Sequence, residues 1–269
     1  MKNKKILLYY LLEFILTIFI FLTIILLILR LTILNKNYFI KTLEKNNYYN
    51  ELYLDINNDF ENYIMQSGFD IKIVDNLFTE DSLKKVINNN VDNFYKGKEI
   101  KVDTNNIKEN LNNNINIYLE SNNIRVTDEK SLNLFINEII NIYKNRIIIN
   151  DKFIKLSNIF YKINKLVNIG TIILFILDII LLIFLKFIFK KIILTIPVLS
   201  SLFILILGYF LILDKININN IVFWNNYVSS IIKSIFLSIS ALIKYIVIIG
   251  IIIELIKLII IYIRKSRKN

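Results

Sequence analysis

Residues 166–213 have the sequence LVNIGTIILFILDIILLIFLKFIFKKIILTIPVLSSLFILILGYFLIL, and this stretch decides the fold of the chain. It contains two apolar runs of about 20 residues, roughly the length that a helix needs to cross the ~30 Å hydrocarbon core of a bilayer. Between the runs lie Lys186, Lys190 and Lys191. Because short basic loops stay on the cytoplasmic side, the stretch predicts two membrane spans, 166–185 and 192–213, joined by a cytoplasmic turn.

A further span is predicted near each end of the chain. The run 6–29 is apolar apart from one glutamate and two threonines. It is too long for the core of a secretory signal and has no alanine for a cleavage site. Counting about 20 residues back from Arg264 gives another span at 244–263. The serine-containing stretch before it, about 221–243, is then an interfacial helix, a re-entrant segment or the outer end of a strongly tilted span.

The segment 35–165, between the first two spans, has the pattern of a polar helical domain. Apolar residues recur at helical spacing, as in Leu52, Ile56, Phe60 and Ile64. Helix starts are expected at Thr79, Thr104 and Thr127, and helix ends at Gly68 and Gly97. We therefore predict four or five helices here. The predicted fold class is an all-α integral membrane protein with four transmembrane helices and this domain inserted between helices 1 and 2.

The distribution of charge predicts the orientation. Segment 35–165 carries 18 basic and 18 acidic residues, so the net charge of +11 belongs to the rest of the chain. Most of those basic residues lie in the head 2–5, the turn 186–191 and the tail 264–268. This predicts a multi-pass protein of the cell membrane with both termini cytoplasmic and 35–165 extracytoplasmic.

The same distribution predicts the domains and one class of partner. The predicted domains are 1–34 with the basic head and helix 1, the helical domain 35–165, and 166–269 with helices 2–4 and the basic tail. Since the basic clusters serve as topology signals, we expect contact with the lipid bilayer and no nucleic-acid partner.

The chain has no cysteine and no histidine. This excludes disulfides, thiolate metal sites, a cysteine nucleophile, the zincin motif and a Ser-His-Asp triad. A dyad of Lys233 with Ser229, Ser230 or Ser234 is the remaining catalytic alternative, but such helix-spaced pairs are common on interfacial helices. We expect no enzyme, no metal and no cofactor.

Three carboxylates remain inside the predicted spans: Glu13, Asp178 and Glu254. Counted from the nearest basic anchors at 1.5 Å per residue, each lies about 12 to 15 Å into the membrane, so we expect a shared depth. Each also lies on a polar face of its helix, which should point into the bundle while Ile, Leu and Phe face lipid. An ionised carboxylate costs on the order of 3 kcal/mol there, so it needs a partner or a proton.

The deeply placed cation is Lys257, three residues after Glu254. Either Glu13, Asp178 and Glu254 form a cation or proton site, or these residues are structural. In the structural alternative Glu254 pairs with Lys257, and the other two carboxyl groups are protonated or bonded to Thr, Tyr and Asn across helices. The first function hypothesis is a non-enzymatic membrane protein whose outer domain binds or senses a partner or ligand, within a larger complex or a homo-oligomer. The alternative is a transporter or permease subunit that uses the carboxylates. Four spans with one proline and no pair of broken helices favour the first.

The order of one span, a large outer domain and three spans is similar to the layout of permease-like proteins of the bacterial cell-division ABC-transporter type. Those proteins have a cytoplasmic segment that engages an ATPase, where here only Met1 to Lys5 precede the first span. The outer-domain stretches YIMQSGFD, LFTEDSLKKVINN and FYKGKEIKVDT resemble uncharacterised multi-pass membrane proteins of low-GC Gram-positive bacteria, over about Tyr48 to Thr127. That group has no assigned activity, so the resemblance implies no function.

Overall fold

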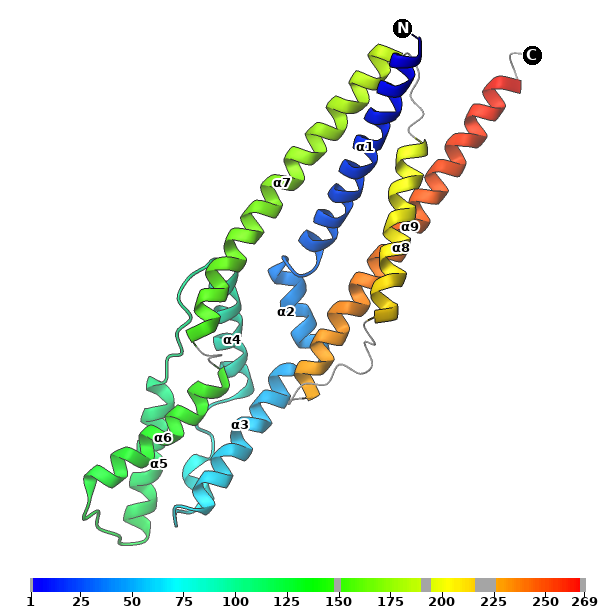
Figure 1. The fold of residues 1–269 in the computed structure, drawn as a ribbon. Helices are drawn as coiled ribbons and strands as arrows, with labels where there is room; N and C mark the ends of the chain where they lie inside the picture. Colours follow the sequence, from blue (N-terminus) through cyan, green and yellow to red (C-terminus); the bar gives the residue numbers. More distant parts are fainter. Residues whose placement is uncertain (1, 148–150, 190–194, 216–225, 267–269) are drawn as a thin grey trace. The chain divides into compact units, whose positions relative to one another are not determined.

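The computed structural model describes residues 2–147, 151–189, 195–215 and 226–266, and within them all regular structure is helical (Figure 1). The predicted all-α class is therefore confirmed. Two lysines of the predicted turn, Lys190 and Lys191, and the tail beyond Ser266 lie outside the described residues. The elements are α1 (Lys2–Leu31), α2 (Lys36–Lys45), α3 (Tyr48–Met65), the 3-10 helix η1 (Ile71–Val74), α4 (Glu80–Tyr95), α5 (Asn105–Ser121), α6 (Glu129–Ile147), α7 (Asp151–Phe189), α8 (Thr195–Lys215) and α9 (Asn226–Ser266).

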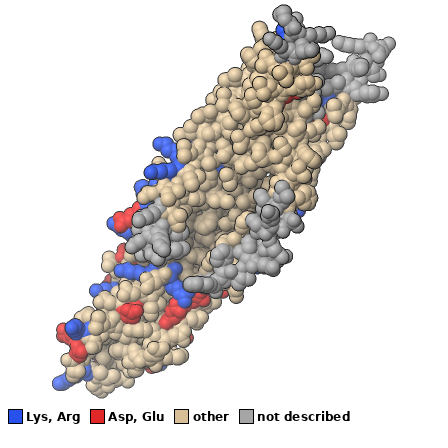
Figure 2. Space-filling model, viewed as in Figure 1, with Lys and Arg blue, Asp and Glu red and all other residues tan. Residues whose placement is uncertain are grey.

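The chain forms two compact units. One unit combines residues 1–39 with 163–269, and the other comprises residues 40–162. Figure 2 shows Lys, Arg, Asp and Glu side chains gathered over the second unit, whereas the apolar helices carry few of them. We call the first the apolar unit and the second the polar unit.

Among the described residues, three helices are long and apolar enough to cross a membrane. The qualifying segments are Lys5–Leu31, Leu156–Phe189 and Asn226–Ile260. In α8 the apolar part is shorter, Ile196–Phe210, although the whole helix has 21 residues and a length of about 32 Å. The membrane class is supported by these helices, and a fourth span remains a prediction.

Helix α9 is continuous over 41 residues, from Asn226 to Ser266. The predicted division between an interfacial segment and a span at 243/244 does not coincide with any break in it. A re-entrant turn has no place within these residues, because the stretch up to Ile249 contains neither proline nor glycine. At Gly250 a Cβ would lie 2.6 Å from Leu202 Cδ1, so the glycine lets α8 and α9 approach closely.

The core of the apolar unit joins α1, α8 and α9. Its buried members are Ile28, Leu202, Leu205 and Val247. Helices α8 and α9 are also linked by a 2.8 Å hydrogen bond between the hydroxyls of Tyr209 and Ser240. The single proline, Pro197, lies in the first turn of α8, where its missing N–H breaks no intrahelical bond.

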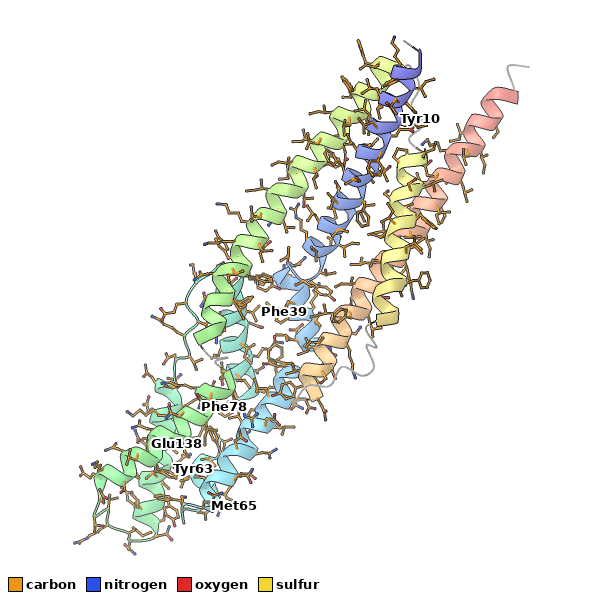
Figure 3. All side chains as sticks on the ribbon, in the orientation of Figure 1. Tyr10, Phe39, Tyr63, Met65, Phe78 and Glu138 are labelled. Carbon is orange, nitrogen blue, oxygen red and sulfur yellow. The ribbon has the colours of Figure 1, made fainter. Side chains whose placement is uncertain are left out.

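The polar unit has a conventional water-soluble core. The predicted stripe of α3, Leu52, Ile56, Phe60 and Ile64, is fully buried. Phe78 lies between helices, with its ring against those of Phe60 in α3 and Tyr143 in α6 (Figure 3). Burial raises the pKa of Tyr143 to about 12, since the phenolate would be desolvated there. The apolar spacing in the sequence therefore identified the core of this helix correctly.

Polar side chains hold this core together at its edges. Arg146 of α6 donates two hydrogen bonds to Asp59 of α3, from Nε to Oδ2 at 2.5 Å and from Nη2 to Oδ1 at 2.9 Å. The Asn114 amide in α5 donates to the carbonyls of Ile73 and Asp75, both at 3.0 Å. These two side-chain hydrogen bonds hold η1 against α5.

The helix ends follow local chemistry, with two corrections. Thr79 forms the predicted cap of α4, as a capping box with Ser82, and Gly97 ends that helix with a φ of 63°. Thr104 precedes α5, but its side chain makes no capping bond. The predicted start at Thr127 is wrong by one residue, because the carboxylate of Asp128 accepts the N–H groups of Lys130 and Ser131.

The two threonines give a matched test of capping. We expect Thr79→Ala to lower the free energy of unfolding of the polar unit by about 1 kcal/mol, because the N–H of Ser82 loses its acceptor. Thr104→Ala removes no capping bond and should cost less than about 0.5 kcal/mol. Denaturant unfolding of the full chain, followed by hydrogen exchange in α4 and α5, measures both changes. Equal losses in the two variants would contradict this assignment.

Candidate functional site

The apolar helices bury polar side chains beside their apolar core and leave many large apolar side chains exposed. On α7, Thr171 and Asp178 are buried, whereas Ile172, Phe175 and Ile176 are exposed. Helix α1 repeats the pattern, because Glu13, Thr17 and Thr23 are buried while residues such as Tyr10 point outward (Figure 3). A water-soluble helix has the reverse arrangement. This inversion is expected where the surrounding medium is hydrocarbon, and it follows the predicted orientation of the polar faces.

Asp178 lies against α1 and is only 8% exposed. The hydroxyl of Thr23 donates to its Oδ2 at 2.9 Å. The second oxygen, Oδ1, is buried and has no hydrogen-bond partner among the described residues. One neutral donor therefore satisfies half of this carboxyl group and leaves the other half without a donor.

Glu13 is 6% exposed and lies in the same helix as Thr17. The Thr17 hydroxyl does not reach the carboxylate; it donates to the backbone carbonyl of Glu13 at 2.9 Å. Within the described part of the chain, Oε1 of Glu13 is buried without a partner. Glu13 is thus a second incompletely satisfied carboxyl group of the apolar unit.

The register of α1 against α7 separates these two carboxyl groups. Tyr9 packs its ring on Phe189 with centroids 5.0 Å apart, and Thr23 bonds Asp178, so the helices run antiparallel. Ten residues of α1, about 15 Å, therefore lie between Glu13 and the level of Asp178. The shared depth expected for all three carboxylates is wrong for Glu13, because counting from basic anchors takes no account of helix register.

Glu254 and Lys257 form the ion pair that the sequence suggested. The Nζ of Lys257 lies 3.1 Å and 3.3 Å from the two carboxylate oxygens. Glu254 is 5% exposed, whereas the side chain of Lys257 is 34% exposed, so a half-buried ammonium group compensates the charge of a buried carboxylate.

Glu254 lies close to the level of Asp178. Val247 belongs to the same core cluster as Ile28 of α1, and α9 runs antiparallel to α1 (Figure 1). Two turns after Val247, Glu254 is therefore within about one turn of the level of Thr23. No group of three or more acidic side chains in the described residues could hold a metal ion. The geometry favours separate structural carboxyl groups over one shared ion site.

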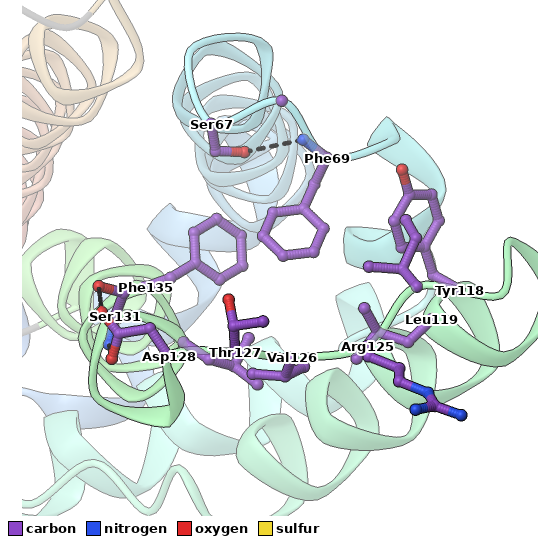
Figure 4. Close-up of a pocket in the computed structure, with 13 residues that line it drawn as sticks. Ser67, Phe69, Tyr118, Leu119, Arg125, Val126, Thr127, Asp128, Ser131 and Phe135 are labelled. Atoms are coloured by element: carbon purple, nitrogen blue, oxygen red, sulfur yellow. Dashed lines mark hydrogen bonds between the residues drawn. The ribbon is translucent and has the colours of Figure 1, made fainter.

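The polar unit contains a groove that sequence reasoning did not predict. Its volume is about 470 Å³, within the range of small-ligand sites (Figure 4). The rings of Phe69, Tyr118 and Phe135 line it, and Phe69 packs 4.7 Å from Phe135 and 5.7 Å from Tyr118. These residues come from the loop after α3, from the end of α5 and from α6.

The loop between α5 and α6 forms one side of the groove, and a capped helix end lies on each side of this loop. Helix α5 ends with Asn123 at a φ of 54°, and the N–H of Ile124 returns to the carbonyl of Leu119 at 2.9 Å. This is a Schellman-type end in which Ile124 and Leu119 both line the groove. Four residues later Asp128 begins α6. The pKa of Asp128 is lowered because the Ser131 hydroxyl and backbone N–H donate to its carboxylate.

Two residues in the left-handed conformation mark the chain turns beside the groove: Gly68, which lines it, and Asn123, which precedes the lining residue Ile124. The sequence predicts a helix break at Gly68 and no special role for Asn123, because asparagine is abundant in this chain. The catalytic alternative gains no support, since the Ser230 hydroxyl donates to the carbonyl of Asn226 at 3.0 Å in its own helix.

Comparison with protein-family models, curated proteins and solved structures finds no match to this chain. Two features of the chain bear on its function: the buried carboxyl groups of the apolar unit and the groove of the polar unit.

The bond between Thr23 and Asp178 can be tested against a neighbouring threonine. Thr23→Val leaves both oxygens of a buried carboxyl group without a donor, and we expect a loss of about 1–3 kcal/mol in unfolding free energy. Thr17→Val removes only a bond to its own helix and should cost about 0.6 kcal/mol or less. Unfolding in detergent measures both variants. A Thr23→Val protein as stable as Thr17→Val would contradict the assignment.

Proposed function

We propose that this chain is a non-enzymatic multi-pass protein of the cell membrane whose polar unit binds a protein partner or ligand outside the cytoplasm. The observation that carries the proposal is the opposite burial of the two units. Residues such as Asp178 and Glu254 are buried in the apolar unit, whereas Ile56 and Phe60 are buried in the polar unit. One unit therefore suits hydrocarbon and the other suits water.

In this proposal α1, α7, α8 and α9 are the four spans. The lysine-bearing connection between α7 and α8 lies in the cytoplasm, as do the basic ends of the chain. Residues 40–162 then lie outside. Their net charge is close to zero, which suits a binding domain better than a surface for a polyanion.

The binding role rests on the groove formed by the α5–α6 loop. Aromatic walls and an open side are typical of sites that recognise a ligand. The role fits a component of a larger membrane complex or of a homo-oligomer, since the exposed apolar surface of α7 offers lipid or helix contacts. Nucleic acid has no place in this scheme.

A transporter or permease subunit is the second candidate function. The observation in its favour is the pair of buried carboxyl oxygens without donors, on Glu13 and Asp178. The observations against it are the separation of these groups along α1 and the pairing of Glu254 with Lys257. A structural role for the three carboxylates does not require that they come together at one site.

The orientation can be tested by cysteine labelling, because the natural chain has no cysteine to interfere. We expect a cysteine at exposed Asn113 to react with a membrane-impermeant maleimide in intact cells. The matched variant Lys186→Cys, at the end of α7, should react only after the cells are opened. The reverse result, with Lys186→Cys labelled in intact cells, would exclude the proposed orientation.

Partner binding is tested by photo-crosslinking in intact cells. A photoreactive residue at exposed Ile117 of the polar unit should give a discrete protein adduct on a gel. The same residue at lipid-facing Ile176 serves as the control and should give none at that mass. If neither Ile117 nor other exposed positions of residues 40–147 yields an adduct, the binding role fails.

A further inference from the structure

The loop between the two caps has free backbone hydrogen-bonding groups. The N–H and C=O groups of Arg125, Val126 and Thr127 make no hydrogen bond within the described part of the chain. The N–H of Ile124 is bonded to the carbonyl of Leu119 at the end of α5. The carboxylate of Asp128 accepts the first N–H groups of α6. Three consecutive residues that line the groove therefore keep backbone donors and acceptors that the fold does not use.

Two exposed apolar side chains line the same groove. Between residues 40 and 147, the large apolar side chains that stay exposed are Leu54, Met65, Ile117, Ile124, Val126 and Leu134. Ile124 and Val126 of this set line the groove, and Leu54 does not. Exposed apolar side chains within a groove suit an interaction surface.

The rim of the groove carries one cationic and one anionic side chain, Arg125 and Asp128. Arg125 forms no ion pair among the described residues, and its side chain extends outward from the ring-lined interior (Figure 4). The carboxylate of Asp128 already accepts the backbone N–H groups of Lys130 and Ser131 and the Ser131 hydroxyl, whereas the Arg125 guanidinium has no such partner among the described residues. An occupant of matching charge would hold an acidic group outside the groove, next to the guanidinium.

We propose that the groove binds an extended peptide segment. Its backbone pairs with Arg125–Thr127, one large apolar side chain packs on the outer surface of the Phe69 and Phe135 rings, and an acidic group meets Arg125. This inference rests on the proposed binding role of the polar unit and names the kind of partner. A peptide supplies both backbone donors and acceptors, whereas a lipid acyl chain supplies neither and would leave the loop unpaired.

The test uses the full chain in lipid nanodiscs and a displayed library of short random peptides. Panning should enrich peptides with a large apolar residue close to an acidic one. The binding constant of a synthesised, fluorescent member is then measured for the wild type and for variants. Val126→Lys should weaken binding by more than about tenfold. Arg125→Glu should weaken it by about three- to tenfold, and less at high salt.

The matched control is Leu54→Lys, which places the same charge on an apolar side chain of similar exposure away from the groove. It should leave binding unchanged within about twofold. Unfolding of each variant is measured in parallel, so that only folded variants are compared. Equal binding by the wild type and Val126→Lys would overturn the proposal, as would a library without enrichment over empty nanodiscs.

A lipid occupant is a further outcome that would overturn it. In that case monomeric dihexanoylphosphatidylglycerol would bind the wild type, fail to bind Val126→Lys and displace any peptide. Failure of this proposal is separable from failure of the proposed function. Peptides that bind equally to Val126→Lys leave a binding role for another surface, whereas labelling of Lys186→Cys in intact cells removes the orientation while the groove still binds peptide.

Discussion

A carboxyl group within a bilayer needs a partner or a proton, and the packing of the apolar unit follows from that constraint. Helix α7 turns its polar face toward α1, so that Asp178 meets the hydroxyl of Thr23. Helix α9 carries its own counter-charge, because Lys257 lies one turn from Glu254. The faces left outside are rich in isoleucine and phenylalanine. Those side chains have no polar groups, so contact with lipid leaves no hydrogen bond unmade. The proposed topology therefore depends on the burial of polar side chains in this unit.

The polar unit buries apolar side chains, as a water-soluble protein does, and its groove lies where α5 ends and α6 begins. Its core is apolar, and its edges are held by Arg146 with Asp59 and by the amide of Asn114. Where α5 ends and α6 begins, each helix satisfies its own terminal groups through Asn123 and Asp128. The residues between them belong to neither helix, which is why their backbone groups remain available beside the groove. In the proposed function, the apolar unit defines the position of the chain in the membrane and the polar unit binds the partner.

Much of this fold could be predicted from the sequence, because it depends on local periodicity. The stripe from Leu52 to Ile64, the cap at Thr79 and the burial of Asp178 follow from spacing and residue type. What could not be predicted depends on register between segments far apart in the chain. The level of Glu13 depends on how α1 pairs with α7, and counting along one helix cannot supply that pairing. The groove was missed for the same reason, since Phe69, Tyr118 and Phe135 are brought together only by tertiary packing.

The central claim is that the apolar face of α7 is in contact with hydrocarbon. Spin labels at Ile172, Ile176 and Ile180, three exposed positions of that face, measure it directly in nanodiscs through collisions with oxygen and with a water-soluble nickel complex. Frequent collisions with oxygen and few with nickel are expected at all three positions, and the reverse is expected at Asn113 of the polar unit. Nickel collisions along α7 as frequent as those at Asn113 would contradict it.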